Sequence, residues 1–184
     1  MAGGPGYTIR LCSAEQLRRH MASLVSLLQD AVEDGASVGF LPPLSEADAR
    51  AYWETVRAAI AGGARRLIVA EEGDRVLGAV QLDLPVMPNA RHRGEVMKLI
   101  VHRAARRRGI GRALMQALER TAAALDRTLL VLDTRRGDAA EQLYTSLGYR
   151  AAGVIPRYAM SARGTLDDTV YMYRELGSAG AHEA

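Results

Sequence analysis

The stretch Glu95–Leu125 of the sequence, EVMKLIVHRAARRRGIGRALMQALERTAAAL, decides the fold. It begins with Val96–Val101, which is apolar except for Lys98, and so short an apolar run predicts a strand covered on both faces. It ends with apolar residues at steps of three and four, which predict a helix whose apolar face packs on a sheet. These residues are Ile110, Leu114, Leu118, Ala122 and Leu125. The stretch therefore joins a central strand to an amphipathic helix through a basic loop.

The loop between this strand and this helix combines arginines with two glycines, Gly109 and Gly111. The first turn of a helix has backbone N–H groups without an intrahelical partner, and the helix dipole places partial positive charge at this end. Glycines let an anion come close to these donors because they carry no side chain. An ordinary tight turn or a solvated basic patch would explain each feature separately. Their coincidence at one helix start predicts a phosphate-binding site.

The glycine spacing of this loop does not fit two other phosphate-binding motifs. A dinucleotide fingerprint needs a third glycine, and a nucleoside triphosphate loop needs Gly-Lys followed by Ser or Thr, which the sequence lacks. What remains is Arg106-x-x-Gly109-x-Gly111, which resembles the Gln/Arg-x-x-Gly-x-Gly/Ala signature of the GNAT superfamily of acetyl-CoA-dependent N-acetyltransferases. In that family the loop amides hold the pyrophosphate of coenzyme A, and the preceding strand offers backbone groups to the pantetheine arm.

The resemblance extends in element order over most of the chain, from about Thr8 to Leu176. A second family landmark is AxxLYxxxGY at 140–149, which places Tyr144 at the position of the family's usual tyrosine acid. The chain departs from the family at Gly137, where an asparagine that contacts the cofactor often stands. The resemblance implies acetyl-CoA as the acetyl donor. It also implies a set of cofactor-binding residues, namely Leu99, Ile100, Val101, Arg106, Arg107, Arg108, Gly109, Ile110, Gly111 and Arg112.

The sequence predicts the order β-α-α-β-β-β-α-β-α-β-β in a single domain, 1–184, with a core from about 7 to 176. Ser13 and Gln16 form a capping-box pattern that starts a helix ending by Gly35. Ser45 caps a second helix that runs to about Ala61. Further strands are expected at 7–12, 66–72, 75–84, 128–134, 149–155 and 169–176, a helix at 138–147 and a disordered tail at 177–184.

These elements predict an α/β fold with a mixed, mostly antiparallel central sheet flanked by helices on both faces. This is the GNAT fold that the resemblance implies. The resemblance further implies that the strands at Val96 and Leu130 part near their ends and leave a cleft for the pantetheine arm.

Acetyl transfer to an amine needs a base for the nitrogen, a stabiliser for the oxyanion and a proton for the departing thiolate. Glu95 precedes Arg106 by eleven residues, a spacing similar to that of the general-base glutamate in the histone-acetylating branch of GNAT. Asp133 ends an apolar strand, where open α/β sheets bind ligands. Either carboxylate could serve as the base, and either is also explained as a solvated or turn residue. The resemblance makes Tyr144 the acid, and a backbone N–H within 99–101 would meet the oxyanion.

The loop at 35–44 carries apolar residues among its glycines and prolines, which suits either a loop tucked over the core or a wall of the substrate site. Phe40 of this loop, Asp133 and Tyr158 are therefore candidate substrate contacts. A turn between the last two strands would explain Arg157 and Tyr158 equally well.

Three phrases of the sequence look similar to the tabtoxin-resistance-type acetyltransferases, which acetylate a small toxic amino acid analogue. They are GASVGFLPPLS (35–45), KLIV (98–101) and LVLDT (130–134). We therefore expect a small-molecule amine acceptor. A protein N-terminus or lysine as acceptor is the alternative within the enzyme class, and a non-catalytic acetyl-CoA sensor is the alternative outside it.

Charge and composition argue against several other classes of protein. Without five arginines of one loop, the formal net charge would fall from +3 to −2. The five are Arg103, Arg106, Arg107, Arg108 and Arg112. Nucleic-acid binders more often spread basic residues along a face with interleaved aromatics, so we expect no nucleic acid.

Cellular location and metal content are also constrained by the sequence. No apolar stretch reaches the length of a membrane span, and the start lacks the apolar core of a signal peptide, so we expect a cytoplasmic protein without membrane contact. His92 and His102 have no second ligand at metal spacing, so we expect no metal site. A homodimer is compatible with the sequence.

Overall fold

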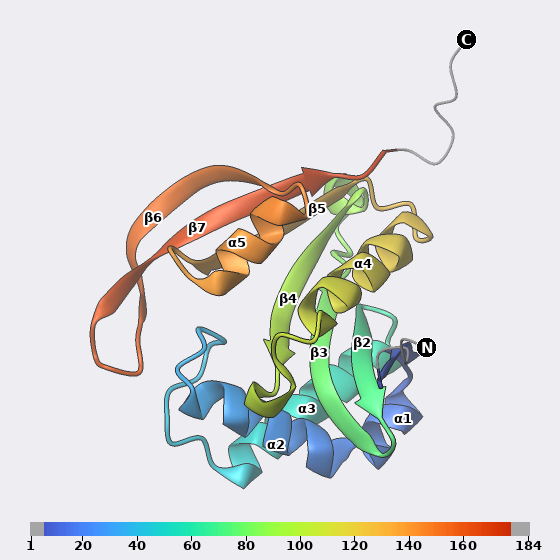
Figure 1. The fold of residues 1–184 in the computed structure, drawn as a ribbon. Helices are drawn as coiled ribbons and strands as arrows, with labels where there is room; N and C mark the ends of the chain where they lie inside the picture. The colour runs from blue at the N-terminus through green and yellow to red at the C-terminus, as the bar shows by residue number, and fades with distance from the viewer. Residues whose placement is uncertain (1–5, 178–184) are drawn as a thin grey trace, which may run out of the picture.

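The computed structural model describes residues 6–177, which form a seven-stranded sheet with helices on both faces (Figure 1). The strands are β1 (Thr8–Cys12), β2 (Arg65–Glu72), β3 (Arg75–Asp83), β4 (Arg93–Val101), β5 (Leu129–Arg135), β6 (Arg150–Met160) and β7 (Leu166–Glu175). The helices are α1 (Ala14–Arg19), α2 (Met21–Glu33), α3 (Glu46–Ala61), α4 (Ile110–Ala123) and α5 (Ala139–Ser146). Two short 3-10 helices, η1 (Pro88–Ala90) and η2 (Arg103–Ala105), flank β4. The predicted fold class is confirmed, and the expected disorder at 178–184 lies outside the described residues.

The sheet is mixed because one of its strand pairs is parallel. The strand order is β1-β2-β3-β4-β5-β7-β6, and within residues 6–177 only β4 and β5 run parallel. Their pairing stops after three residue pairs, the last of which joins Glu95 to Val131. Beyond this point the two strands part, as expected. The second half of β4 is therefore left without a partner on the β5 side.

Each face of the sheet has its own hydrophobic core. Helices α1 to α3 pack on one face, where Trp53 is completely buried and its indole Nε1–H donates to the Leu24 carbonyl at 2.9 Å. Helix α4 packs on the other face through the apolar positions predicted from its sequence, including Ile110, Leu114 and Leu118. In the part of the chain that is described, none of the helices has the length and apolar character needed to span a bilayer.

Two expectations about the elements were wrong. The single helix predicted between Ser13 and Gly35 is two helices, because His20 ends α1 and begins α2 while its imidazole Nε2 lies 3.1 Å from the Glu71 carboxylate. The capping box at Ser13 is confirmed. The turn expected near Arg157 is part of β6, which continues to Met160. An edge strand tolerates Pro156 because it needs no ladder hydrogen bond on its open side, and the β6–β7 register shifts at this point.

Gly78 in β3 fixes how closely α4 approaches the sheet. A Cβ at this position would lie 3.0 Å from the Ile100 carbonyl oxygen and 3.1 Å from side-chain atoms of both Ile110 and Leu114. The start of α4 can therefore reach its observed place only over a glycine.

We predict that Gly78→Ala lowers the free energy of unfolding by about 1–3 kcal/mol, because α4 must move away from the strand. Gly153→Ala is the matched control, since a Cβ on Gly153 of β6 would have no atom within 4 Å. That variant should stay within about 0.5 kcal/mol of the parent. Urea denaturation measures both, and equal stability of the two variants would contradict the close packing of α4.

Candidate functional site

A cavity of about 590 Å³ lies where β4 and β5 part, between the start of α4 and the end of α2. Nine of the ten predicted cofactor-binding residues line it, namely Leu99, Ile100, Val101, Arg106, Arg107, Gly109, Ile110, Gly111 and Arg112. Arg108 is the exception. Its guanidinium instead contacts the Glu72 carboxylate at 2.6 Å and lies over the Tyr7 ring. The side chain of Arg108 thus does not line the cavity, and its predicted role in binding the cofactor stays a prediction.

The first turn of α4 opens on this cavity. Gly109 is the N-cap residue and has φ +78°, a left-handed conformation that glycine adopts without the steric cost that a side chain brings. No side chain caps this end of the helix. A Cβ on Gly111 would lie 3.3 Å from Leu143 of α5, so the second glycine lets the helix pack closely against α5. The backbone N–H groups at the start of α4, together with the positive end of the helix dipole, therefore face the cavity.

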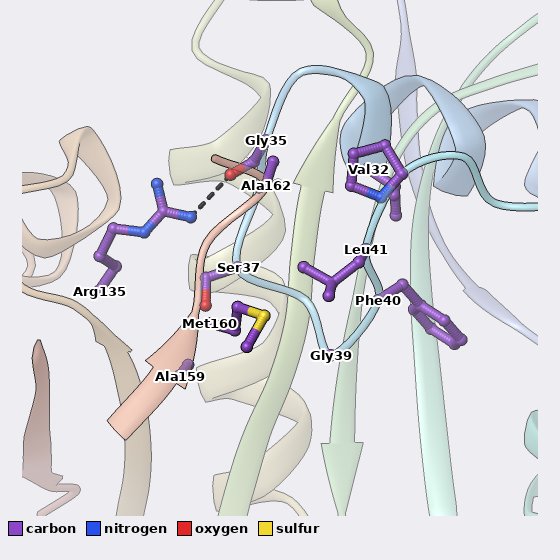
Figure 2. A pocket seen from close by; sticks show the side chains of 12 residues that line it. Val32, Gly35, Ser37, Gly39, Phe40, Leu41, Arg135, Ala159, Met160 and Ala162 are labelled. Atoms are coloured by element: carbon purple, nitrogen blue, oxygen red, sulfur yellow. Dashed lines mark hydrogen bonds between the residues drawn. The ribbon is translucent and has the colours of Figure 1, made fainter. Parts of the chain in front are cut away.

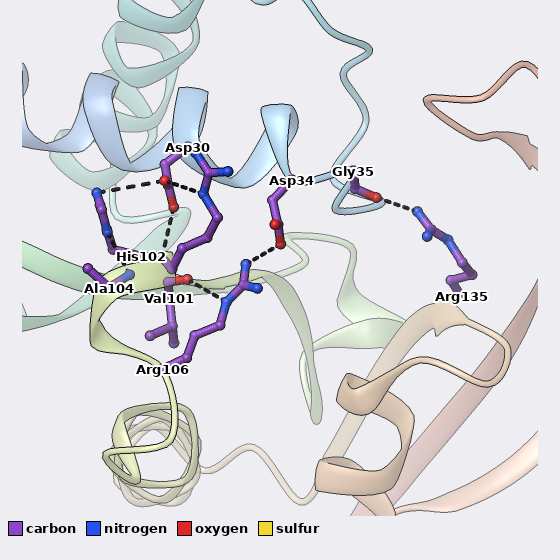
Figure 3. Close-up of polar contacts among 9 residues, drawn as sticks. Asp30, Asp34, Gly35, Val101, His102, Ala104, Arg106 and Arg135 are labelled. Atoms are coloured by element: carbon purple, nitrogen blue, oxygen red, sulfur yellow. Dashed lines mark hydrogen bonds and ion pairs between the residues drawn. The ribbon is translucent and has the colours of Figure 1, made fainter.

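Ion pairs tie the basic loop to the end of α2 (Figure 3). The Arg106 guanidinium lies 2.6 Å from the Asp34 carboxylate, and its Nε donates to the Val101 carbonyl at 3.4 Å. Asp30, one turn earlier on α2, accepts from both the backbone N–H and the Nε of Arg103. Sequence reasoning missed these acidic partners because about 70 residues separate them from the loop. The charge of Arg106 is therefore already partly neutralised by a carboxylate that also lines the cavity.

A second, smaller cavity of about 240 Å³ lies beside the first (Figure 2). Its walls come from the loop between α2 and α3, which includes Phe40, and from the end of β6, which includes Met160. Arg135 of β5 lines both cavities. Its Nη2 donates to the Gly35 carbonyl at 2.7 Å, and its Nε lies 3.0 Å from the Asp167 carboxylate. The predicted substrate contact Phe40 thus lies on a pocket wall, and Arg135 joins the loop to the β5 and β7 strands.

Glu95 lies on β4 and Asp133 on β5, where the two strands part, and neither carboxylate lines either of the two cavities. The hydrogen bond between the hydroxyls of Tyr158 and Tyr171, 3.0 Å long, raises the pKa of Tyr171 to about 12, and the charges of Asp133 and Glu95 act on it in the same direction. Asp133 also accepts a hydrogen bond of 3.1 Å from Thr169 of β7. The structure therefore brings both candidate bases and the candidate contact Tyr158 to one region. Tyr171 was missed because its pairing opposite Asp133 is a matter of strand register.

Tyr144 lies on α5, with its side chain in the hydrophobic core that α4 covers. It is 6% exposed, and its ring centroid lies 5.7 Å from that of Tyr149. Burial raises the pKa of the Tyr144 hydroxyl well above its usual value, and the negative charge of Asp133 adds to this effect. The hydroxyl therefore holds its proton throughout the neutral range. The charge of Asp133 thus raises the pKa of both Tyr144 on α5 and Tyr171 on β7.

Comparisons with known proteins agree with this arrangement. A sequence profile described as the Acetyltransferase (GNAT) family matches residues 24–149. A ribosomal-protein-alanine N-acetyltransferase from Brucella melitensis has a similar fold, with a TM-score of 0.74 and 24% identity over 92% of this chain and 99% of that one. A GNAT superfamily phosphinothricin acetyltransferase from Sinorhizobium meliloti, in complex with AcCoA, gives a TM-score of 0.77 at 23% identity over 97% of this chain and 92% of that one. At such identities the structures compare the fold alone.

We predict that Asp34→Asn strengthens the binding of inorganic pyrophosphate by about 3- to 10-fold, because it frees Arg106 to act as an anion ligand and removes a like charge from the cavity. The matched control is Glu33→Gln, which makes the same charge change one residue earlier at an exposed position. Calorimetric titration at low salt measures both. If Glu33→Gln gained as much affinity as Asp34→Asn, the effect would be one of net charge and not of the Arg106 ion pair.

Proposed function

This chain belongs to the GNAT family of acetyltransferases and uses acetyl-CoA as its acetyl donor, and we propose that its acceptor is a primary amine on a small molecule. The observation that carries the proposal is the pair of carboxylates, Glu95 and Asp133, which lie on β4 and β5 where these strands part and whose charges both act on Lys98 and Tyr171. An ammonium group is the natural partner of such a pair. The cavity of about 240 Å³, which Phe40 and Arg135 line, is of a size for a small acceptor.

The residues around the larger cavity fit the donor. We propose that the backbone N–H groups of Gly109 to Arg112 and the Arg106 side chain hold its pyrophosphate, since a helix start with an open N-cap suits a phosphate. The unpaired side of β4, from Leu99 to Val101, would receive the pantetheine arm. When bound, acetyl-CoA supplies an acyl thioester whose carbonyl carbon is open to attack by an amine.

Side chains of this protein would accept the proton of the acceptor amine and donate a proton to the leaving thiolate. One carboxylate of the Glu95 and Asp133 pair takes a proton from the ammonium form of the acceptor, and the other holds the acceptor in place. The Tyr144 hydroxyl, which is protonated at neutral pH, would give its proton to the departing thiolate, and the burial that raises its pKa makes it a weaker acid until the thiolate forms beside it. A backbone N–H within 99–101 stabilises the carbonyl oxygen as negative charge develops on it.

We further propose that the chain is nearest the tabtoxin-resistance-type branch, on the three phrases that it shares with that branch. The similar fold of a phosphinothricin acetyltransferase supports a small acceptor. The similar fold of a ribosomal-protein-alanine N-acetyltransferase favours a protein N-terminus as the second candidate. A non-catalytic acetyl-CoA sensor is the third, but the retention of Glu95 and Tyr144 argues against it.

The direct test is a screen of small primary amines and of peptides with acetyl-CoA, in which the release of free thiol is followed. We expect turnover with small amines and little with peptides. Faster turnover with a peptide N-terminus or lysine would replace the small-molecule acceptor with a protein. Binding of acetyl-CoA without any turnover would favour the sensor.

We predict that Tyr144→Phe lowers kcat by about 10²- to 10⁴-fold, since it keeps the ring packing and removes the proton donor. The affinity for acetyl-CoA should change little. Tyr149→Phe is the matched control, because it removes a hydroxyl from the neighbouring ring, which lies beside Glu119 and Arg174. Steady-state kinetics of both variants decide the question. Full activity of Tyr144→Phe would assign this tyrosine to the core alone.

Glu95 and Asp133 can be distinguished by the pH dependence of kcat/KM, which rises with pH as the essential base loses its proton. Glu95→Gln and Asp133→Asn each keep the shape of the side chain and remove its basicity. We predict that Glu95→Gln erases the acidic limb and lowers kcat, whereas Asp133→Asn mainly raises KM. The reverse pattern would exchange the two roles. Full activity with an unchanged acidic limb in both variants would contradict a carboxylate base.

A further inference from the structure

Lys98 is the only lysine in the sequence, in which 24 residues are lysine or arginine. Every other basic side chain of these two types is an arginine. Lys98 also interrupts the otherwise apolar run of β4, at the strand that parts from β5. The use of lysine at this one position, where arginine is used elsewhere, indicates that Lys98 has a specific role.

The backbone at Lys98 turns its side chain toward the acceptor side of the sheet. In the pairing of β3 with β4, Ala79 lies opposite Ile100 but Gln81 lies opposite Met97, so β4 contains one extra residue. Lys98 has φ +51°, a left-handed conformation that is uncommon for a residue with a side chain. Such bulges change the direction in which a side chain points.

The ammonium group of Lys98 lies beneath the loop that joins α2 and α3. It is 6.0 Å from the centroid of the Tyr52 ring, and a Cβ on Gly39 would lie 3.3 Å from it. Gly39 also lines the smaller cavity. The absence of a side chain on Gly39 therefore leaves space beside the charge.

Among residues 6–177, the ammonium of Lys98 has no hydrogen bond and no ion pair, although its side chain is half-buried. Burial lowers the pKa of Lys98, while the charges of Asp133 and Glu95 oppose this effect and that of Arg65 adds to it. Two arginines of this region, Arg65 and Arg135, already have partners. Arg65 bonds to Asp83 and Gln81, and Arg135 contacts Asp167 and the Gly35 carbonyl. Lys98 is thus the cation of this region that remains open to a ligand.

We propose that Lys98 binds a carboxylate of the acceptor, so that the acceptor is a zwitterionic amino acid whose ammonium faces Glu95 and Asp133. This inference rests on the proposed acetylation of a small amine. A half-buried charge without a partner is costly, and a carboxylate on the acceptor would remove that cost on binding. Two carboxylates and one cation in the same region match a molecule that carries both an amine and an acid group.

The test compares kcat/KM for an amino acid with that for its primary amide, which keeps the amine and side chain but lacks the negative charge. The parent protein should prefer the amino acid by about 10- to 100-fold. Lys98→Met keeps the length of the side chain and removes its charge, so it should raise KM for the amino acid and abolish the preference. Arg120→Met is the matched control, because it removes an exposed charge from α4 on the other face of the sheet. An equal loss for acid and amide in Lys98→Met would assign Lys98 to the fold and overturn the proposal.

A second measurement needs no substitution. Because Lys98 is the only lysine, reductive methylation with ¹³C-formaldehyde labels its ammonium and the chain's amino terminus alone, and it keeps the positive charge. The Lys98 methyl resonance should shift when the amino acid is added and stay in place when the amide is added. Equal shifts with both, or with neither, would contradict the proposed contact.

Failure of the proposed function and failure of the Lys98 contact give different results. If no primary amine is acetylated, the proposed function itself is wrong. If amines are acetylated but the acid and the amide serve equally well in the parent, only the role of Lys98 is wrong. Retention of the stabilisation by acetyl-CoA in Lys98→Met shows that the variant is folded.

Discussion

The short pairing between β4 and β5 is the constraint on which the site depends. Three residue pairs hold these parallel strands together, and they stop at Glu95 and Val131. If the pairing continued, the backbone groups of β4 from Leu99 to Val101 would be used within the sheet, and no cavity could open beside the start of α4. Because it stops, the backbone of β4 and the start of α4 line one cavity, whereas Glu95 and Asp133, on the two parting strands, line neither of the two cavities. The bulge beside Lys98 lies in the same half of β4, and the Lys98 ammonium lies near Gly39, which lines the smaller cavity.

Local patterns predicted most of the fold. Three of these patterns each span only a few residues, and the structure has all three. They are the capping box at Ser13, the cap at Ser45 and the apolar spacing of α4. The loop predicted to bind phosphate was identified in the same way, since a helix start and its glycines are neighbours in sequence. Strand ends were less accurate at β6, because a proline reads as a turn signal and the bulge that accommodates it on an edge strand leaves no trace in the sequence.

Contacts between distant segments could not be predicted from the sequence. Asp34 and Arg106 are brought together by the packing of α2 beside β4, and Tyr158 meets Tyr171 across two strands whose register shifts between Ile155 and Ala159. Arg135 had a local signal, because it follows Asp133 by two residues and so lies on the same face of β5. Lys98 had one as well, as the sole interruption of an apolar run, but the bulge beside it left no signal in the sequence. The polar contacts of the site thus join residues far apart in sequence, whereas the helices and the loop that surround it follow from patterns within a few residues.

The central claim is that the open start of α4 holds acetyl-CoA, and the gain in stability on binding tests it most directly. At one hundred times its Kd, acetyl-CoA should raise the free energy of unfolding of the parent by about 2.7 kcal/mol. Gly109→Asp should abolish this gain through bulk and negative charge. Gly63→Asp should keep it, because Gly63 has nearly the same φ, +79°, and open space around it. A parent whose stability is unmoved by acetyl-CoA, or a Gly109→Asp variant that keeps the full gain, would contradict the account.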